Sequence, residues 1–431
     1  MSRVNVVNPQ TATGEARNPA RQRETSLKRI ARALASCMTR HAKACGFAAP
    51  RSRWLRFHVG ASCAALLAAT LCTAQNSSIA GSSVNGTIGR RSHRPAELWV
   101  THQRDSAISV LKFPSGIVLD EFSLPAGTQP HITTFHSEAF AYISGMGNGT
   151  LSIVDAKSRQ VVHTLTFAPT LCHQGKVSPD GTTMLVTAIS TQMLHKVAVD
   201  EVNRSWTAVG SVSFAPLGAK PICSVFRGDS QRAYVSMLPS GIAIVDVPSL
   251  TILRTLATDG FVACAMIKPN ANADHAVVAS AGSGGHIYML DMTNDTLVDR
   301  GTVGADDWHS FNMTRDGGLG FGTSPASDEV VVVDLTTSPV KSLGTIALQP
   351  LPGSGNSQPD SLGGGEAIMN GTLPVGLRAA GQVALIDAED LEIRKFIEIA
   401  SPSPPGTFST ATCSGCSVHG VTVRPNSTCA R

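Results

Sequence analysis

A short apolar run followed by an aspartate recurs six times along this chain. The aspartates are Asp155, Asp200, Asp246, Asp291, Asp334 and Asp387. They follow one another at intervals of 45, 46, 45, 43 and 53 residues, and a seventh copy 43 residues upstream has Lys112 in place of the aspartate. A period in the forties built of short apolar runs is typical of a β-propeller, in which each unit is one small sheet.

Each repeat has four segments with the pattern of β-strands. In the unit that begins at His173, we expect strands at residues 173–181, 183–189, 195–200 and 207–214, because each segment alternates or is apolar over five to eight residues. The sequence therefore predicts an all-β fold, a single propeller of seven four-stranded blades. The repeated aspartate is expected to accept backbone hydrogen bonds in the turn after the third strand.

The two ends of the repeat region predict how the ring closes. The first repeat begins at a second strand, residues 97–103, and the last ends with a first strand, residues 419–426. We therefore expect the C-terminal strand to join the N-terminal blade, which removes the free sheet edges.

The N-terminal segment differs in charge from the rest. Residues 1–74 carry twelve Lys and Arg and two acids, a net charge of +10, whereas the whole chain has +4 and residues 75–431 therefore have −6. The repeat region lacks the basic character of a nucleic-acid-binding protein, so no nucleic-acid partner is expected.

Within this basic segment lies an apolar stretch, residues 59–72, that has the length of a signal-peptide core. We predict export, periplasmic or secreted, after cleavage near Ala74; if uncleaved, the segment would be a membrane anchor. The predicted organisation is a leader at 1–74, a linker at 75–96, the propeller at 97–426 and a tail at 427–431.

Six cysteines follow the leader, and an even number in an exported chain is compatible with disulfides. They are Cys172, Cys223, Cys264, Cys413, Cys416 and Cys429. Connectivity cannot be deduced, and a Cys172–Cys223 pair is one option. Covalent haem c is not expected, because attachment needs a histidine directly after the second cysteine and Ser417 follows Cys416.

One repeat is longer than the others. Its extra segment, residues 348–368, is rich in Gly, Pro and Ser and is predicted to be a mobile loop at the mouth of the axial channel.

Two segments carry a family resemblance. Residues 141–165 (AYISGMGNGTLSIVDAKSRQVVHTL) and 233–256 (AYVSMLPSGIAIVDVPSLTILRTL) resemble the YVTN-type repeats of YncE-like propellers. The resemblance covers residues 97–426. It implies an exported binding or scaffold protein, although relatives with similar blades include lactonases, haem-handling proteins and a copper-dependent nitrous oxide reductase. The fold by itself does not choose among them.

Histidines recur at the start of the first strand of each blade. These equivalent positions, called here the axial column, are His131, His173, Ile222, Ala263, His309, Glu366 and His419. Because innermost strands surround the axis of a propeller, we expect His131, His173, His309, Glu366 and His419 to line a ligand site at the channel mouth.

Imidazole and thiolate ligands together suit copper or zinc. The candidate metal ligands are His131, His173, His309, His419, Cys172 and Cys223. In the alternative interpretation, these histidines hydrogen-bond the backbone of neighbouring blades and no metal is bound.

Two functions remain open from the sequence. The favoured one is a monomeric, non-catalytic binding propeller that presents its channel mouth to a small molecule or a protein. The alternative is an enzyme on the same face, either similar to a lactonase or isomerase or dependent on copper or zinc. No catalytic residue is assigned.

Overall fold

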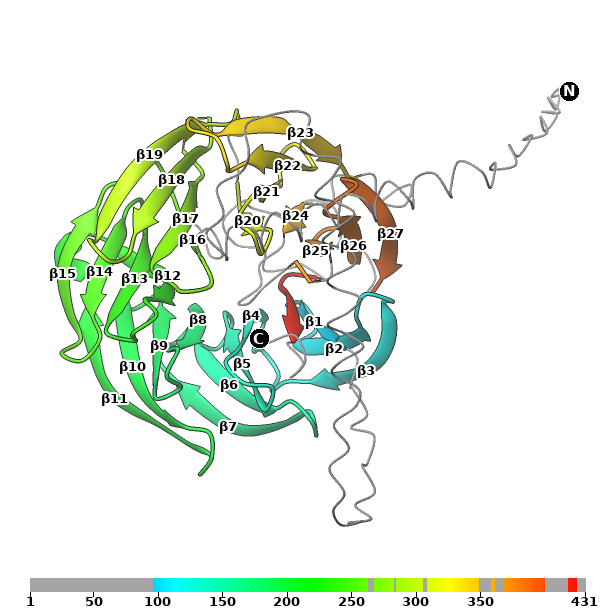
Figure 1. Ribbon diagram of the computed structural model, residues 1–431. Coiled ribbons are helices and arrows are strands. Elements are labelled where there is room, and N and C mark those ends of the chain that lie inside the picture. Colours follow the sequence, from blue (N-terminus) through cyan, green and yellow to red (C-terminus); the bar gives the residue numbers. More distant parts are fainter. Residues whose placement is uncertain are drawn as a thin grey trace, which may run out of the picture. The chain divides into compact units, whose positions relative to one another are not determined.

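The computed structural model describes residues 96–262, 267–282, 284–304, 308–348, 358–360, 368–369, 371–399 and 418–424. All of them belong to one compact unit, Arg91–Arg431. Their strands form seven four-stranded antiparallel sheets arranged as blades around a ring (Figure 1). The predicted seven-bladed β-propeller is thus confirmed.

The blades are numbered along the chain, each from its innermost strand outward. Blade 1 contains β28 (Val421–Arg424), β1 (Glu97–His102), β2 (Ala107–Lys112) and β3 (Ile117–Ser123). Blade 2 contains β4 (Pro130–Phe135), β5 (Phe140–Gly145), β6 (Thr150–Asp155) and β7 (Gln160–Thr166). Blade 3 contains β8 (Cys172–Val177), β9 (Thr183–Ala188), β10 (Met193–Asp200) and β11 (Ser205–Ser213).

Blade 4 follows a 3-10 turn, η1 (Ala215–Leu217), and contains β12 (Lys220–Phe226), β13 (Arg232–Leu238), β14 (Ile242–Asp246) and β15 (Thr251–Leu256). Blade 5 contains β16 (Ile267–Pro269), β17 (His275–Ser280), β18 (His286–Asp291) and β19 (Thr296–Thr302). Blade 6 contains β20 (Ser310–Met313), β21 (Leu319–Ser324), β22 (Glu329–Asp334) and β23 (Lys341–Ala347). Blade 7 contains β24 (Pro359–Asp360), β25 (Thr372–Leu377), β26 (Gln382–Asp387) and β27 (Glu392–Glu398).

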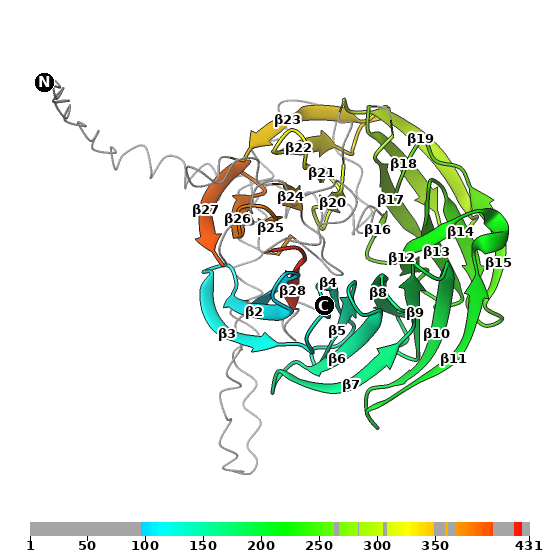
Figure 2. The ribbon, with the colours of Figure 1, turned by 180° about the vertical axis from the view of Figure 1, so that it is seen from behind.

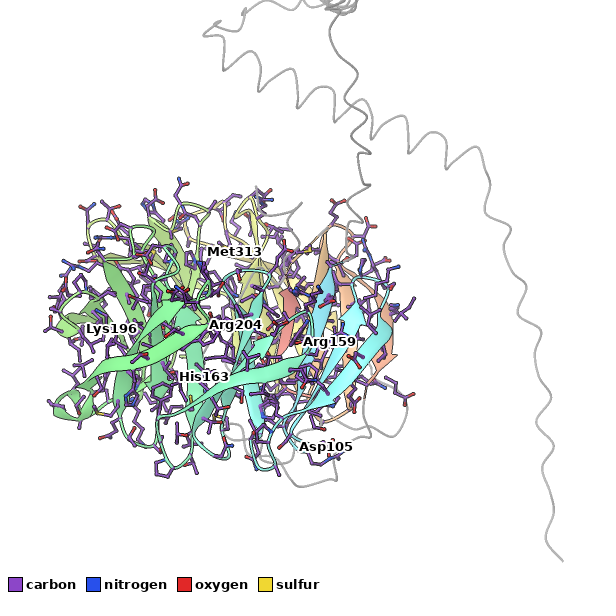
Figure 3. All side chains as sticks on the ribbon, turned by 90° about the horizontal axis from the view of Figure 1, so that it is seen from below. Asp105, Arg159, His163, Lys196, Arg204 and Met313 are labelled. Atoms are coloured by element: carbon purple, nitrogen blue, oxygen red, sulfur yellow. The ribbon has the colours of Figure 1, made fainter. Side chains whose placement is uncertain are left out.

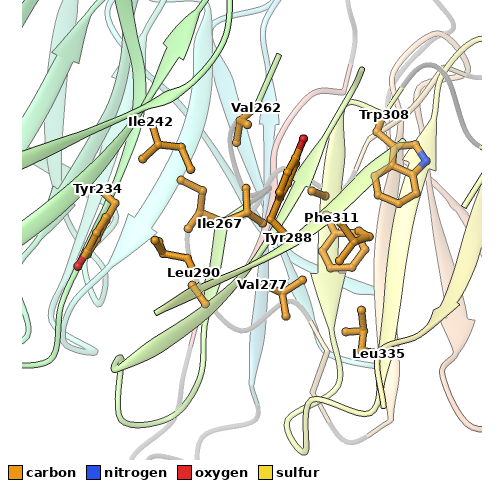
Figure 4. Packing of buried hydrophobic residues seen from close by; sticks show 14 of the residues in the cluster. Tyr234, Ile242, Val262, Ile267, Val277, Tyr288, Leu290, Trp308, Phe311 and Leu335 are labelled. Atoms are coloured by element: carbon orange, nitrogen blue, oxygen red, sulfur yellow. The ribbon is translucent and has the colours of Figure 1, made fainter. Parts of the chain in front are cut away.

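Burial within a blade follows the position of each strand. Second strands such as β5 are buried along their whole length, because both faces pack against neighbouring blades. Fourth strands such as β7 alternate between exposed and half-buried residues at the rim of the ring. The blades pack through apolar clusters, of which the one between blades 4, 5 and 6 includes Tyr234, Tyr288 and Trp308 (Figure 4).

The recurring aspartate closes the turn after the third strand, as predicted. Oδ1 of Asp155 accepts hydrogen bonds from the backbone N–H groups of Lys157 and Ser158, and Asp291 and Asp387 do the same in their own turns. These backbone bonds, with that from Ser158 foremost, lower the pKa of Asp155. The aspartates are therefore structural.

The ring closes through the C-terminal strand, which confirms the predicted closure. β28 pairs antiparallel with β1 from Glu97↔Arg424 to Val100↔Val421, and both views show it at the inner edge of blade 1 (Figures 1 and 2). Arg424 Nη1 lies 2.9 Å from Glu97 Oε2 and 3.3 Å from the Ala156 carbonyl oxygen of blade 2. The closing strand thus ties the first two blades together.

The predicted mobile loop at residues 348–368 is partly wrong. β24, inside that segment, is the innermost strand of blade 7 and pairs with β25 through Pro359↔Leu377 and Asp360↔Gly376. The strand therefore begins several residues earlier than the repeat alignment placed it. Glu366, the predicted column residue of this blade, lies outside the described residues.

No helix among the described residues is both long and apolar enough to cross a membrane.

Candidate functional site

The innermost strands change register where the axial column begins. The pairing shifts between Pro130 and Thr133 in β4, between Cys172 and Gln174 in β8, and between Pro221 and Ser224 in β12. Such a bulge places an extra residue opposite the neighbouring strand and redirects its side chain. His131, His173 and Ile222 occupy these bulges, which accounts for their shared position at the axis.

Three hydroxyl groups on second strands hold the bulges in place. Thr101 Oγ1 donates to the His131 carbonyl oxygen at 3.1 Å, Ser144 Oγ to that of His173 at 2.7 Å, and Thr187 Oγ1 to that of Ile222 at 2.6 Å. Each hydroxyl also accepts a backbone N–H from the first strand of its own blade. We call Thr101, Ser144 and Thr187 the hydroxyl belt.

Sequence reasoning missed this belt. The signal is nevertheless present, because a Ser or Thr recurs near the end of the second strand in VTH, ISG, VTA and VSM. Each belt hydroxyl joins one blade to the next, so the repeat encodes contacts between blades as well as within them.

Four histidines of the axial column meet at one end of the axis, as predicted. His131 Nε2 lies 2.9 Å from His173 Nε2. The His419 ring lies 4.1 Å from the His131 ring and 6.3 Å from the His309 ring, between centroids. The side chains come from blades 1, 2, 3 and 6, and we call His131, His173, His309 and His419 the histidine cluster.

Burial keeps three of these imidazoles neutral. Desolvation, followed by repulsion from His309, lowers the pKa of His173 to about 3. The pKa values of His131 and His419 are also lowered, first by burial and then by repulsion from a neighbouring histidine. At neutral pH each ring therefore has one N–H donor and one nitrogen lone pair.

One set of neutral tautomers satisfies the contacts of His131 and His173. His173 Nδ1 lies 3.6 Å from Cys223 Sγ, and a hydrogen bond with the Ile222 backbone favours a proton on His173. With that proton on Nδ1, His173 Nε2 accepts a hydrogen bond from His131 Nε2–H. His131 Nδ1 then accepts a hydrogen bond from Gln103 Nε2 at 3.1 Å. No feature of the repeat pattern pointed to Gln103.

A buried carboxylate orients the fourth histidine. Asp360 Oδ2, fully buried in β24, lies 2.7 Å from His309 Nδ1 and 3.9 Å from Nη1 of Arg378, which is 2% exposed. The carboxylate accepts a hydrogen bond from His309 Nδ1–H and so turns the Nε2 side of the ring away from itself. Sequence reasoning missed both residues, and it missed Asp360 because the alignment started the first strand of blade 7 too late.

The cysteine predictions need correction. Cys172 is a free, buried thiol in an apolar cluster with Leu151 and Val186, and burial raises its pKa to about 12. It therefore forms no disulfide with Cys223 and offers no thiolate to a metal. Cys223 is held in a disulfide, so it is not a thiolate ligand either. Cys264, Cys413, Cys416 and Cys429 lie outside the described residues.

Within the described ranges, no group of three or more His, Cys, Asp or Glu side chains is arranged to hold a metal ion. The short contact between the Nε2 atoms of His131 and His173 gives a physical reason, because nitrogens that share a hydrogen bond are not both available as ligands.

No protein-family model matches the chain, and no curated protein matches it in sequence. Several solved propeller structures are similar in fold. A protein of unknown function from Desulfotomaculum acetoxidans has a TM-score of 0.55 at 12% identity, over 76% of this chain and 98% of the other. Kuenenia stuttgartiensis hydrazine synthase has a TM-score of 0.51 at 16% identity, over 70% and 96%.

A putative 6-phosphogluconolactonase from Bacteroides uniformis has a TM-score of 0.51 at 16% identity, over 58% of this chain and 82% of the other. At such identities the similarity shows the fold alone. The chain is a seven-bladed β-propeller, a class that includes both scaffolds and enzymes.

Proposed function

We propose that this chain is an exported propeller of the YVTN type that binds a small molecule at the histidine cluster. The convergence of His131, His173, His309 and His419 at one end of the axis carries the proposal. The basic leader and the cleavage predicted near Ala74 support export, and the repeat pattern supports the family.

The polar atoms around the cluster indicate the chemistry of the ligand. His419 Nδ1 and Gln103 Oε1 are buried and have no hydrogen-bond partner among the described residues. An unsatisfied buried polar atom typically costs about 1–3 kcal/mol. A neutral ligand rich in O–H or N–H donors, such as a polyol or an amide, would satisfy these acceptors.

Native mass spectrometry of the full chain, purified from an exporting host, tests the proposal. We expect a small-molecule adduct that is lost in His419→Phe and retained in His275→Gln, a control at an exposed histidine whose side chain pairs with Asp274. The same preparations would be melted with glucose and with acetamide as probes. The proposal fails if no adduct forms and if neither probe raises the melting temperature of the wild type by more than it raises that of His419→Phe.

The hydrogen bond between His309 and Asp360 favours a second candidate, an enzyme. A carboxylate that holds the Nδ1 proton leaves His309 Nε2 free to act as a general base, and some propellers of similar fold are putative lactonases. In this alternative, His309 would activate water for lactone hydrolysis, or the cluster would hold copper or zinc.

Two measurements separate the enzyme from the binder. Hydrolysis of gluconolactone by the wild type, lost in His309→Gln, would support the hydrolase. Stoichiometric copper or zinc in the purified protein, detected by elemental mass spectrometry and lost in His131→Phe, would support the metalloenzyme. Without either result, the binding function stands alone.

A further inference from the structure

The axis has a second polar site, which begins at Gln174 and Cys223, beside the histidine cluster, and extends along the innermost strands away from it. A cavity of about 420 Å³ is lined by residues toward the C-terminal ends of β8, β12, β16 and β20 and by the turns that follow them. Lys176 follows His173 by three residues along β8, and Met313 follows His309 by four along blade 6. Figure 3 views the ring from its edge, with Met313 toward one face and Asp105, in the turn after Gln103, at the other.

The lining of this cavity is basic. Lys176, Lys268, Arg315 and His136 contribute to it, and no Asp or Glu is among its described lining residues. Elsewhere in the described blades, basic side chains such as Arg159 and Arg232 are paired with carboxylates. Among the described residues, Lys268 has no ion pair.

The two lysines are close enough to affect each other. Burial, followed by repulsion from Lys176, lowers the pKa of Lys268 to about 7. Burial also lowers the pKa of Lys176. A half-buried ammonium group beside a second one, as at Lys268, is unfavourable unless negative charge joins it.

Neutral donors complete the lining. Asn270 and Asn312 contribute amide groups, and Ser224 and Ser236 contribute hydroxyls. The volume is within the range of small-molecule sites, near its lower end. The ligand is therefore compact and anionic, with polar groups besides its charges.

We propose that this cavity binds a small organic dianion, with its two negative groups held by Lys176 and Lys268 and with Arg315 at the rim. A dicarboxylate and a phosphomonoester share this chemistry. None of the four clustered histidines lines this cavity, so its ligand can be tested apart from the function proposed above.

The arrangement also predicts proton uptake. Lys268 is only partly protonated near neutral pH, and a bound anion would raise its pKa and draw a proton onto it. The other titratable groups in the described lining are Lys176, Arg315 and His136. Affinity is therefore expected to fall as the pH rises above 7.

Isothermal titration of the full chain tests the proposal, with succinate and glycerol phosphate as probes and putrescine as a cationic control. We expect one anion to bind, with proton uptake revealed by comparing buffers of different ionisation enthalpy. Binding of succinate only would assign a dicarboxylate, and of glycerol phosphate only a phosphomonoester. Lys268→Met is expected to weaken binding about tenfold or more.

A matched variant keeps the test falsifiable. Lys157→Met removes an exposed lysine from the turn after β6 and is expected to bind as the wild type does. Lys268→Met replaces a half-buried ammonium by an apolar group of similar length, so it is expected to fold. The proposal is overturned if neither anion binds the wild type, or if Lys268→Met binds as tightly as Lys157→Met.

Discussion

Both ends of the axis bury weak bases, but the buried groups differ in charge at physiological pH. At one end, burial takes the pKa of His173 to about 3, so the imidazole is neutral at physiological pH. At the other, burial and a neighbouring cation take the pKa of Lys268 to about 7, so the ammonium is still partly charged. The unperturbed pKa is near 6.5 for histidine and near 10.4 for lysine. Comparable desolvation therefore leaves neutral rings with lone pairs at one end and positive charge at the other.

This difference underlies the opposite ligands proposed for the two ends. Neutral imidazoles accept hydrogen bonds, as does Gln103 Oε1, which has no partner among the described residues, whereas Lys176 and Lys268 donate them and attract anions. The two proposed sites on one axis are thus chemically distinct, and both depend on the ring being closed.

The largest effect is expected from opening the ring. Deleting residues 421–431 removes β28 with Val421, Val423 and the buried Arg424–Glu97 pair, and it exposes the edge of β1. We expect a loss of more than about 5 kcal/mol, comparable to the whole stability of a typical domain. Thermal melts followed by circular dichroism would measure it. Deleting residues 430–431 only, which spares β28 and all six cysteines, is the control, and equal melts for both truncations would contradict the role of β28.

Acid is expected to have the next largest effect, through the histidine end. The unfolded chain binds protons at His131, His173 and His419 near pH 6.5, whereas the folded protein does not until the pH is far lower. Stability is therefore unaffected above pH 6.5 and falls below it, by up to about 1.4 kcal/mol per pH unit for each histidine.

Urea unfolding at pH 7, 6 and 5 checks this expectation, and imidazole NMR titration reports the individual rings. His275→Gln, at an exposed position, should show the same acid loss as the wild type. If the free energy of unfolding does not change between pH 7 and 5, and His131 titrates near 6.5, the contrast between the two ends is removed.

The buried carboxylate of the histidine end provides the third prediction. Asp360→Asn removes the charge that lies between His309 and Arg378 and leaves the guanidinium buried. Breaking such a pair typically costs about 3–5 kcal/mol. Asp120→Asn, which removes an exposed partner of Arg159, should change the free energy of unfolding by less than about 1 kcal/mol. Similar losses in the two variants would show that Asp360 is not held as described.

The lysine end should respond to pH in the opposite range. The folded pKa of Lys268 lies below its unfolded value, so its protonated form destabilises the fold below pH 7, and this penalty disappears as the pH rises from 7 toward 10.5. Lys268→Met removes the penalty, and we expect it to stabilise the protein by about 2 kcal/mol at pH 6, a value reduced because the side chain is only half-buried.

Urea unfolding of Lys268→Met and wild type at pH 6 and 10 measures this difference. The two proteins should differ at pH 6 and converge by pH 10. A variant that is less stable than the wild type at pH 6 would mean that Lys268 is a structural residue.

The repeat was enough to predict the fold, since the spacing of residues such as Asp155 and Asp291 reports one blade at a time. It also predicted the histidine cluster, because equivalent positions in a ring meet at the axis. It could not predict Asp360, because an insertion moved β24 out of alignment. Nor could it predict the lysine pair, because Lys176 and Lys268 belong to different blades and their closeness depends on the width of the channel.

The hydroxyl belt provides the smallest effect and the sharpest separation of the two ends. Thr101→Val keeps the shape of the side chain but removes its hydroxyl. The Gly420 N–H then loses its acceptor, and the His131 carbonyl oxygen loses a donor. A lost buried hydrogen bond of this kind costs about 1–2 kcal/mol. Thr101→Ser keeps the hydroxyl and should recover most of the loss in urea unfolding.

Because the belt contacts the bulges at the histidine end, Thr101→Val should alter the NMR signals of His131 and His419 while the titration of Lys268 stays near 7. A joint change at both ends would show instead that the axis responds as one unit. In that case the chemical contrast between histidine and lysine would not make the two sites independent.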